Sequence, residues 1–253
     1  MTKISATILT HNEAAHIEAC LESLRDVADE IIVVDSFSTD ATVDICRNYG
    51  CRITRRRIAG FGAQRQYATS LTSHSYVLAI DADEALSPAL RQSLIELKKR
   101  GCTHRGYMMA RLNFFCGYAV KHGGWYPDFQ VRLFDKRFAS WSLRDVNEQV
   151  IFHDNVTPEL LAGDLLHYRC STAAEYKFRC LRQAEIQAAS IAKADGVIGP
   201  VTPSIHGLKH FLHTYISCRG ILDGSIGFAI SRQHYIATRH AYRTARKLQK
   251  SKK

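Results

Sequence analysis

Carboxylates that follow apolar runs are the residues of this sequence best suited to chemistry. Asp81 and Asp83 stand two positions apart, directly after the apolar run 76–80. At the end of a strand, residues i and i+2 point to the same side, about 7 Å apart at Cα. Two carboxylates at this spacing suit one divalent cation, Mg²⁺ or Mn²⁺, whose remaining ligands usually include substrate phosphates. The alternative is that both carboxylates only cap the following turn.

Two other polar segments follow apolar runs in the same way. Residues 10–13 (Thr-His-Asn-Glu) follow the run 4–9, and residues 35–38 (Asp-Ser-Phe-Ser) follow the β-branched run 31–34. A continuous β-branched run is typical of a strand that is buried on both faces. Because ligands of open α/β sheets bind at the carboxyl ends of the strands, the three polar ends predict a ligand site at one edge of a sheet.

The elements that position these residues alternate over the first hundred positions. Helices are expected after a cap at Asn12, after a cap at Asp40, over 63–72, and from Ser87-Pro88 to about Arg100. Strands are expected at 4–9, 31–34, 50–54 and 76–80. This alternation predicts an α/β fold with a Rossmann-like, mainly parallel sheet flanked by helices.

The rhythm changes after Gly101. Strand patterns at 107–112, 130–134 and 147–152 are separated by irregular segments rich in glycine and aromatic residues, and a helical pattern spans 172–195. Residues 199–203 form a linker-like break before two further helical stretches. We therefore expect a catalytic domain over 1–198, with halves of about 1–100 and 101–198, and a helical extension over 199–253.

Composition excludes several classes of protein. The chain has 253 residues, of which 46% are hydrophobic and 23% charged, so it is neither collagen-like, low-complexity nor wholly disordered. None of the eight cysteines forms a CxxC pair, which argues against a zinc ribbon or a thioredoxin-like site. No apolar leader opens the sequence, and no stretch approaches about 20 apolar residues. These features predict a cytoplasmic protein with reduced thiols.

The net charge of +10 is concentrated near the C-terminus. Residues 205–253 contain ten Lys and Arg residues but a single acid, Asp223, whereas the rest of the chain is nearly neutral. Helical spacing places one group of cations on one face, beside an aromatic stripe; these are Arg232, Arg239, Arg243, Arg246 and Lys250, then Phe228, Tyr235 and Tyr242. A basic amphipathic helix with aromatic residues predicts contact with an anionic membrane surface.

Other interpretations of this basic segment remain open. An apolar stripe also follows helical spacing just before it, through Ile205, Leu208, Phe211, Leu212, Tyr215 and Ile216. The cations can therefore form a solvated face on helices whose apolar sides pack on the domain. A nucleic acid or an acidic protein is another possible partner for such charge.

Four segments, taken in order, resemble the N-terminal half of family 2 glycosyltransferases, which have the GT-A fold and use nucleotide sugars. They are Ile8–Glu13, Ile32–Thr42, Gly60–Arg65 and Leu78–Glu84. Later segments are similar to the branch that contains β-glucosyltransferases of the lipopolysaccharide inner core. These are Trp125–Asp128, Val131–Phe134, Val146–Glu148 and Leu222–Gly224, with Gly227-Phe228 beyond. The resemblance spans roughly residues 4–235.

The resemblance implies a set of donor contacts. Asp35 is expected at the uracil and ribose, because a carboxylate accepts hydrogen bonds from N–H and hydroxyl groups. Thr10 and Glu13 are expected as further nucleotide contacts on the neighbouring loop. Gln64 and Arg65 precede the Asp81 strand, and an arginine there suits the donor diphosphate. The alternative for Arg65 is an ordinary solvated surface residue.

The resemblance also assigns the metal ligands. Asp81 and Asp83 take the Mg²⁺ or Mn²⁺ site, with Asp83 as the direct ligand. His167 follows Leu165-Leu166 and is a third candidate, because many GT-A enzymes use a late histidine as a metal ligand. Against this, a lone histidine among twelve is more often structural.

Family 2 enzymes are generally inverting, which implies a single displacement at the anomeric carbon and one general base. Glu148 matches the acidic residue of the family, although Asn147 stands where relatives of this branch often have His. Asp128 is the alternative base. Either carboxylate can instead be an ion-pair partner of Arg132 or Arg144.

The expected function is a metal-dependent, inverting glycosyltransferase that moves a hexose, glucose from UDP-glucose, onto a core heptose. The acceptor is then a lipid-linked saccharide, the core of lipopolysaccharide. The enzyme is expected to be peripheral on the cytoplasmic face of the inner membrane. Alternative acceptors are a protein or a polyprenyl phosphate, which is already ionised and does not need Glu148. A basic nucleic-acid-binding protein would leave the three polar strand ends without a purpose, so no nucleic-acid partner is expected. The donor hexose, linkage and oligomeric state stay open.

Overall fold

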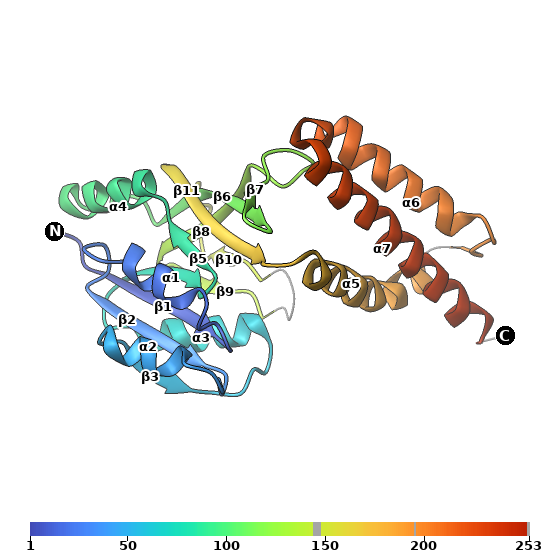
Figure 1. Ribbon diagram of the computed structural model, residues 1–253. Coiled ribbons are helices and arrows are strands. Elements are labelled where there is room, and N and C mark those ends of the chain that lie inside the picture. Colours follow the sequence, from blue (N-terminus) through green and yellow to red (C-terminus); the bar gives the residue numbers. More distant parts are fainter. Residues whose placement is uncertain (144–147, 195, 252–253) are drawn as a thin grey trace. The chain divides into compact units, whose positions relative to one another are not determined.

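The computed structural model of the protein describes residues 1–143, 148–194 and 196–251. The chain forms two compact units, and Figure 1 labels the elements of both. Unit 1 comprises Met1–Arg111 and Phe129–His167, and unit 2 comprises Leu112–Asp128 and Tyr168–Lys253. The chain thus enters unit 2 twice.

Four strands of unit 1 form the parallel part of its sheet. They are β1 (Ile4–Thr10), β2 (Glu30–Asp35), β3 (Arg52–Arg55) and β4 (Tyr76–Asp81). Strand β1 pairs in parallel with β2 and with β4, and β2 pairs in parallel with β3. The register sets Thr10 beside Asp35 and Leu9 beside Asp81, so the polar ends of three strands lie at the same edge, as the sequence predicts.

Helices follow each of these strands. They are α1 (Ile17–Ser23), α2 (Thr42–Asn48), α3 (Phe61–Ser70) and α4 (Pro88–Arg100). The start of α4 has the expected cap, because Ser87 Oγ accepts a hydrogen bond of 3.2 Å from the N–H of Leu90 and Pro88 occupies the first turn. Apolar side chains of helices and strands, among them Leu21, Leu94, Ile8 and Leu78, form one fully buried core. The predicted α/β fold is confirmed.

One of the predicted helix caps is wrong. Helix α1 begins at Ile17, four residues later than a cap at Asn12 requires. Asn12 instead adopts a left-handed backbone with φ of 56°, and its side-chain oxygen accepts a hydrogen bond of 2.7 Å from the N–H of Thr39. Asn12 therefore ties the loop after β1 to the loop after β2. Asp40 does accept a hydrogen bond from the N–H of Thr42, at 3.1 Å, in the first turn of α2.

The second half of the sheet is built from later strands. They are β5 (Glu84–Leu86), β6 (Gly106–Phe115), β8 (Asp128–Asp135) and β11 (Glu159–Cys170), in the overall order β3-β2-β1-β4-β8-β6-β11-β5. Strand β8 is antiparallel to β4, and β11 is antiparallel to β5. A separate pair joins β9 (Ala139–Trp141) to β10 (Val150–Phe152). The sequence did not predict β5, β9 or β11. Asn147, where the predicted strand 147–152 begins, lies outside the described residues.

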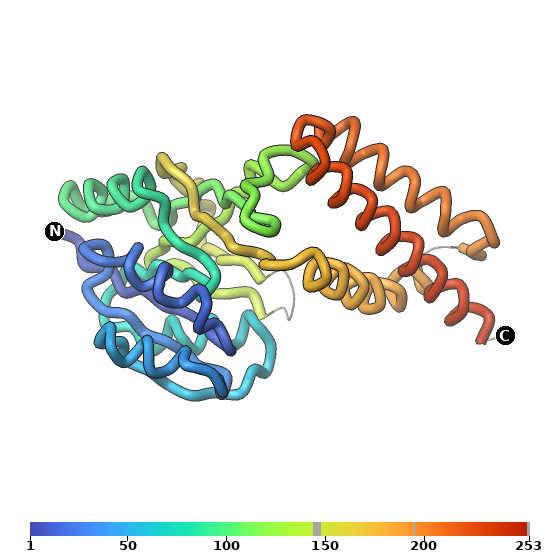
Figure 2. Tube along the Cα trace, in the orientation of Figure 1, coloured from blue at the N-terminus to red at the C-terminus, as the bar shows by residue number. Residues whose placement is uncertain are grey.

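Unit 2 consists mainly of helices. They are α5 (Ala173–Ala194), α6 (Thr202–Leu212) and α7 (Gly224–Lys250), with a π-helical turn η1 (His213–Ser217) and a 3₁₀ turn η2 (Gly220–Asp223) between α6 and α7. A short strand, β7 (Tyr118–Ala119), pairs with the end of β6. Helix α7 packs against both α5 and α6 (Figure 2). Among the described residues, no helix combines the length and apolarity that a bilayer span requires.

Helix α5 belongs to unit 2, so the compact units do not divide at residue 198. The assignment of separate roles to residues 1–198 and 199–253 stays a prediction.

The aromatic stripe of α7 has a different place from the expected one. Tyr242 stacks on His206 with ring centroids 4.0 Å apart, and Phe228 meets Phe211 edge-on at 5.9 Å. Tyr235 lies so close to Gly207 that a Cβ on this glycine would come within 2.9 Å of the tyrosine ring. Tyr235 and Tyr242 therefore pack in the seam between α6 and α7, whereas Phe228 contacts α6 but remains 47% exposed.

The basic residues of α7 differ in exposure. Arg232, Arg243 and Lys250 are exposed, whereas Arg239 and Arg246 are half-buried. Contact of this basic face with an anionic membrane surface stays a prediction.

Candidate functional site

Asp35 is held rigidly at the end of β2. It is fully buried, and its carboxylate accepts hydrogen bonds from the N–H of Ser38 at 3.2 Å and from Ser38 Oγ at 2.5 Å. Arg55 Nε, from the end of β3, lies 3.4 Å from Asp35 Oδ2. The loop after β2 and the end of β3 thus fix the carboxylate at the edge where the sequence places the nucleotide.

Thr10 and Gln64 each bury an oxygen that lacks a hydrogen-bond partner within the described protein. The atoms are Thr10 Oγ1, at the end of β1, and Gln64 Oε1, on α3. The amide nitrogen of Gln64 is used, because it donates to the carbonyl oxygen of Arg56 at 3.1 Å. A buried polar atom without a partner costs about 1–3 kcal/mol. Both oxygens are therefore suited to receive hydrogen bonds from a ligand.

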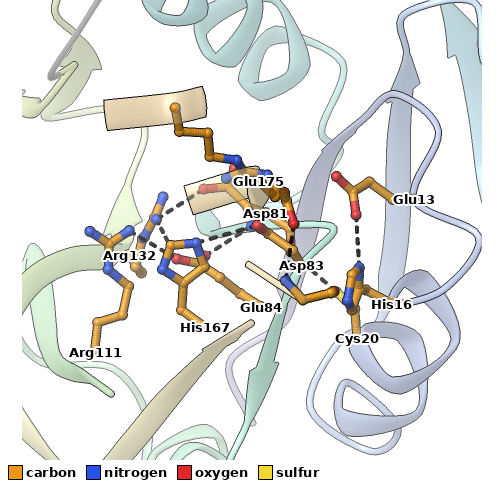
Figure 3. Close-up of polar contacts among 12 residues, drawn as sticks. Glu13, His16, Cys20, Asp81, Asp83, Glu84, Arg111, Arg132, His167 and Glu175 are labelled. Atoms are coloured by element: carbon orange, nitrogen blue, oxygen red, sulfur yellow. Dashed lines mark hydrogen bonds and ion pairs between the residues drawn. The ribbon is translucent and has the colours of Figure 1, made fainter. Parts of the chain in front are cut away.

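Glu13 lies on the loop between β1 and α1. Its N–H donates to Thr42 Oγ1 at 2.8 Å, and its Oε2 lies 3.0 Å from His16 Nδ1. Figure 3 draws this pair together with Asp81, Asp83 and Glu84. A nucleotide contact of Glu13 stays a prediction.

Arg65 links two of the predicted site carboxylates. It is only 5% exposed, on α3, so a solvated surface arginine is the wrong interpretation. Its Nη2 donates to both oxygens of Asp81, at 2.7 and 2.9 Å, and its Nε donates to Glu148 Oε1 at 2.7 Å. The guanidinium also lies over the Trp141 ring, 5.0 Å from its centroid. Arg65 thus bridges Glu148 and Asp81 by donating hydrogen bonds to both carboxylates.

Asp81 is surrounded by positive charge. Arg132 Nη2 donates to Asp81 Oδ2 at 3.2 Å, in addition to the contacts from Arg65. Burial alone raises the pKa of Asp81, but the charges of Arg65 and Arg132 outweigh burial and hold the pKa well below its usual range. Asp81 is therefore an ionised carboxylate that already has two cationic partners.

Glu84 is a site residue that the sequence analysis missed. It is fully buried, and its Oε2 accepts a hydrogen bond of 2.9 Å from the N–H of Asp81. Its Oε1 accepts from Arg132 Nη2 at 2.8 Å and from Arg111 Nη1 at 3.2 Å (Figure 3). Glu84 therefore fixes the backbone at the end of β4 and the arginine that contacts Asp81. The available signal was a third acid in the segment Asp81-Ala-Asp-Glu84.

Asp83 has a different partner from Asp81. Strand β4 ends at Asp81 and the chain turns at once, so the two carboxylates do not share the expected strand geometry. Asp83 Oδ2 lies 3.3 Å from His167 Nε2, as Figure 3 shows. Sequence analysis proposed all three as metal ligands, and the structure brings Asp83 and His167 together.

Strand pairing creates this contact. His167 stands opposite Glu84 in the β11–β5 ladder, so it lies next to Asp83. The register is set by Ser87 and Asp164, where each N–H donates to the other residue at 3.0 Å. Gly163 has φ of +97°, and a Cβ there would come within 2.7 Å of Leu90 Cα. Strand β11 therefore approaches α4 as closely as the backbone allows.

A carboxylate oxygen suits either Mn²⁺ or Mg²⁺, and an added imidazole nitrogen favours Mn²⁺ over the harder Mg²⁺. Within residues 1–143, 148–194 and 196–251, no group of three His, Cys, Asp or Glu side chains is arranged to hold a metal. The donor set thus fits a cation that takes its remaining ligands from a bound substrate.

Asp128, the alternative base, is the first residue of β8 and belongs to unit 2, whereas Glu148 belongs to unit 1. Arg144, the suggested ion-pair partner, lies outside the described residues. Arg132 pairs with Asp81 and Glu84, and Glu148 pairs with Arg65.

Glu84→Gln is expected to lower the free energy of unfolding by about 3–5 kcal/mol, because it removes one charge from a buried ion-pair network. Urea denaturation measures this loss. Asp26→Asn is the matched control, because Asp26 pairs with Arg91 at 2.7 Å on the exposed surface and such pairs contribute about 1 kcal/mol or less. Equal losses in the two variants would contradict the bridging role of Glu84.

The sheet, its flanking helices and the acidic strand ends define the GT-A class of fold that the sequence analysis predicts. Residues 5–132, half of the chain, match the family model described as glycosyl transferase family 2. The protein belongs to glycosyl transferase family 2.

Several proteins of similar sequence are named as glycosyltransferases. An uncharacterised glycosyltransferase of Rickettsia bellii is 44% identical over 92 residues, 36% of this chain and 31% of that protein. The uncharacterised glycosyltransferase RT0209 of Rickettsia typhi is 28% identical over 240 residues, 91% of this chain and 82% of that protein. The lipopolysaccharide core biosynthesis glycosyltransferase LpsC of Rhizobium meliloti is 32% identical over 176 residues, 66% of this chain and 63% of that protein. The match thus spans about a third of the R. bellii relative.

Proposed function

We propose that this protein is a metal-dependent, inverting glycosyltransferase that moves glucose from UDP-glucose to a lipopolysaccharide core saccharide. The observation that carries the proposal is the connected set Asp81, Arg65 and Glu148 beside the Asp83–His167 pair. Asp81, which Arg65 links to Glu148, stands at the carboxyl end of the parallel strand β4, where α/β sheets bind ligands. Membership of glycosyl transferase family 2 supports the class of reaction.

The donor nucleotide occupies the ends of β1 and β2 in this proposal. Asp35 accepts hydrogen bonds from the uracil or ribose, and its tether to Ser38 orients it beforehand. The unpartnered oxygens of Thr10 and Gln64 accept further hydrogen bonds, which removes the cost of their burial. Glu13 completes the nucleotide contacts.

The donor diphosphate lies beside Arg65 and the Asp83–His167 pair. Asp83 and His167 would hold Mg²⁺ or Mn²⁺, which offsets the negative charge that develops on the departing nucleoside diphosphate. Arg65 supplies a second positive charge, with planar donors that match phosphate oxygens. Asp81 orients Arg65 through its paired hydrogen bonds.

Glu148 is the general base of the proposed reaction. A single displacement needs one carboxylate to accept the proton of the attacking acceptor hydroxyl. The hydrogen bond from Arg65 Nε occupies Glu148 Oε1 and fixes the orientation of the carboxylate. Asp128 stays the alternative base.

The acceptor assignment draws on one relative. LpsC is named as a lipopolysaccharide core glycosyltransferase, and its alignment covers 66% of this chain. We extend that acceptor class to this protein and place it peripherally on the inner face of the plasma membrane, where a lipid-linked saccharide acceptor would be met.

A donor and acceptor screen tests the proposal. UDP-, GDP- and dTDP-sugars are incubated with Mn²⁺ and a deacylated, water-soluble core oligosaccharide, and products are identified by mass spectrometry. We expect a product heavier by one hexose with UDP-glucose, and its loss when EDTA removes the metal. Transfer from only GDP- or dTDP-sugars, or full activity in EDTA, would contradict the proposed donor or the proposed metal, respectively.

A further inference from the structure

Helix α6 and its flanks carry a continuous row of exposed aliphatic side chains. We call this row the α6 aliphatic face; it consists of Val201, Ile205, Leu208, Leu212 and Ile216. The spacing of three and four residues places these side chains along one side of the helix. Each of the five is between 42% and 62% exposed. A row of five large exposed aliphatic residues is more than scattered surface apolarity.

The α6 aliphatic face is left over after the helices of unit 2 have packed. Gly207, Phe211 and His206 contact the aromatic stripe of α7 on another side of α6. The contact between α6 and α7 therefore does not use the residues of the α6 aliphatic face. Beyond η1, Ile221 and Leu222 are also exposed.

The charges around this face have one sign. Lys209, one residue from Leu208, and Arg219, between η1 and η2, are exposed. In the described residues from 196 onward Asp223 is the single acid, and it is buried, with its carboxylate bonded to the N–H of His122 at 2.9 Å. The surface around the aliphatic row thus exposes cations and no carboxylate side chain within this described part.

We propose that the α6 aliphatic face inserts into the interfacial region of an anionic lipid bilayer, with Lys209 and Arg219 at the headgroups. Aliphatic insertion flanked by cations is how monotopic helices bind membranes, and each cation near an anionic surface strengthens the binding. This surface lies on α6 and its flanks, and it differs from the basic face of α7 that the sequence predicts. The inference deepens the proposed function, on whose lipid-linked acceptor its purpose rests.

Vesicle binding by the full-length protein tests this inference. The probe is a set of large unilamellar vesicles of phosphatidylcholine, prepared with or without about 30 mol% phosphatidylglycerol. This anionic lipid gives the vesicles a negative surface. Co-sedimentation at 100 mM salt, roughly physiological in screening, measures the partition coefficient without any donor or acceptor. We expect the parent protein to bind the anionic vesicles and to bind the neutral vesicles much more weakly.

Two double variants distinguish the contribution of the α6 aliphatic face to vesicle binding from that of other exposed apolar residues of unit 2. Leu208→Ser with Leu212→Ser is expected to reduce the partition coefficient by roughly tenfold or more, because two leucines no longer leave water. The matched control is Phe178→Ser with Ile186→Ser, which changes two apolar residues of α5 that are more exposed than the two leucines and should leave binding unchanged. Equal binding by the leucine variant and the parent protein would overturn the proposal.

A second pair tests the cations. Lys209→Gln with Arg219→Gln is expected to reduce binding to anionic vesicles by roughly tenfold. Lys177→Gln with Lys193→Gln, on α5, removes the same charge at exposed positions elsewhere in unit 2 and should have little effect. An equal loss in both pairs would mean that total charge, and not this surface, binds the membrane.

Two other occupants of the face are outcomes that would overturn the proposal. A dimer that Leu208→Ser with Leu212→Ser dissociates, in a protein that binds no vesicles, would make the face a subunit interface. Salt-sensitive oligonucleotide binding without vesicle binding would make it a nucleic-acid surface. Because vesicle binding is measured without substrates and the donor screen uses a water-soluble acceptor, failure of this inference is distinguishable from failure of the proposed function.

Discussion

Glu148→Gln is expected to reduce glucosyl transfer by about 10²–10⁴-fold, the usual contribution of a general base. Glutamine has the same shape, and its side-chain oxygen can still accept the hydrogen bond that Arg65 Nε donates to Glu148 at 2.7 Å. The variant should therefore keep its fold and its affinity for UDP-glucose. Isothermal titration measures the affinity, and the rate of product formation at saturating donor measures the transfer.

Asp128→Asn is the matched comparison, because it removes the other carboxylate that the sequence offers as a base. A small effect in Asp128→Asn beside a large one in Glu148→Gln would assign the base to Glu148. The reverse pattern would transfer the role to Asp128. Substantial turnover in both variants would remove general-base catalysis by either carboxylate.

Asp83→Ala is expected to abolish the dependence of donor binding on Mn²⁺ and to lower transfer by roughly 10²–10³-fold, the range measured when one electrostatic contact to the developing charge is lost. The physical reason is that Asp83 and His167, 3.3 Å apart, are the donor pair available at the diphosphate in this proposal. Titration of UDP-glucose in the presence and in the absence of Mn²⁺ measures the effect on binding.

The control for this variant is Asp154→Ala, which removes an exposed carboxylate paired with Arg105. It should titrate like the parent protein. A parent-like Mn²⁺ dependence in Asp83→Ala would show that Asp83 is not the metal ligand. In that case His167→Ala becomes the next variant, since its imidazole is the other half of the pair.

The parallel part of the fold is predictable from the sequence because its signals are local. The run 31–34 is β-branched throughout and fully or half buried in β2, and the polar residues that follow such runs reach the same sheet edge. Ser87-Pro88 marks the start of α4 to the residue. These signals act over a few positions, so no knowledge of the rest of the chain is needed.

The remaining features depend on partners far away in the sequence. In the sequence Glu84 cannot be distinguished from a surface acid, because its partners Arg111 and Arg132 come from the distant strands β6 and β8. The aromatic stripe of α7 has the pattern of an interfacial helix. Its packing on α6 is visible only in the structure, in the close approach of Tyr235 to Gly207 and in the ring contacts of Phe228 and Tyr242. Helical periodicity states that an apolar face needs a partner, but it does not state which partner.

The close approach of β11 to α4 has a consequence for how the metal variants are interpreted. Because a side chain at Gly163 would collide with the backbone of Leu90, a larger residue there must push β11 away from the Ser87–Asp164 clamp. His167, four residues along the same strand, would then move away from Asp83 although neither residue was altered. If Asp83 and His167 hold a cation, as the proposed function requires, loss of cation binding can therefore result from a displaced β11 as well as from a missing ligand.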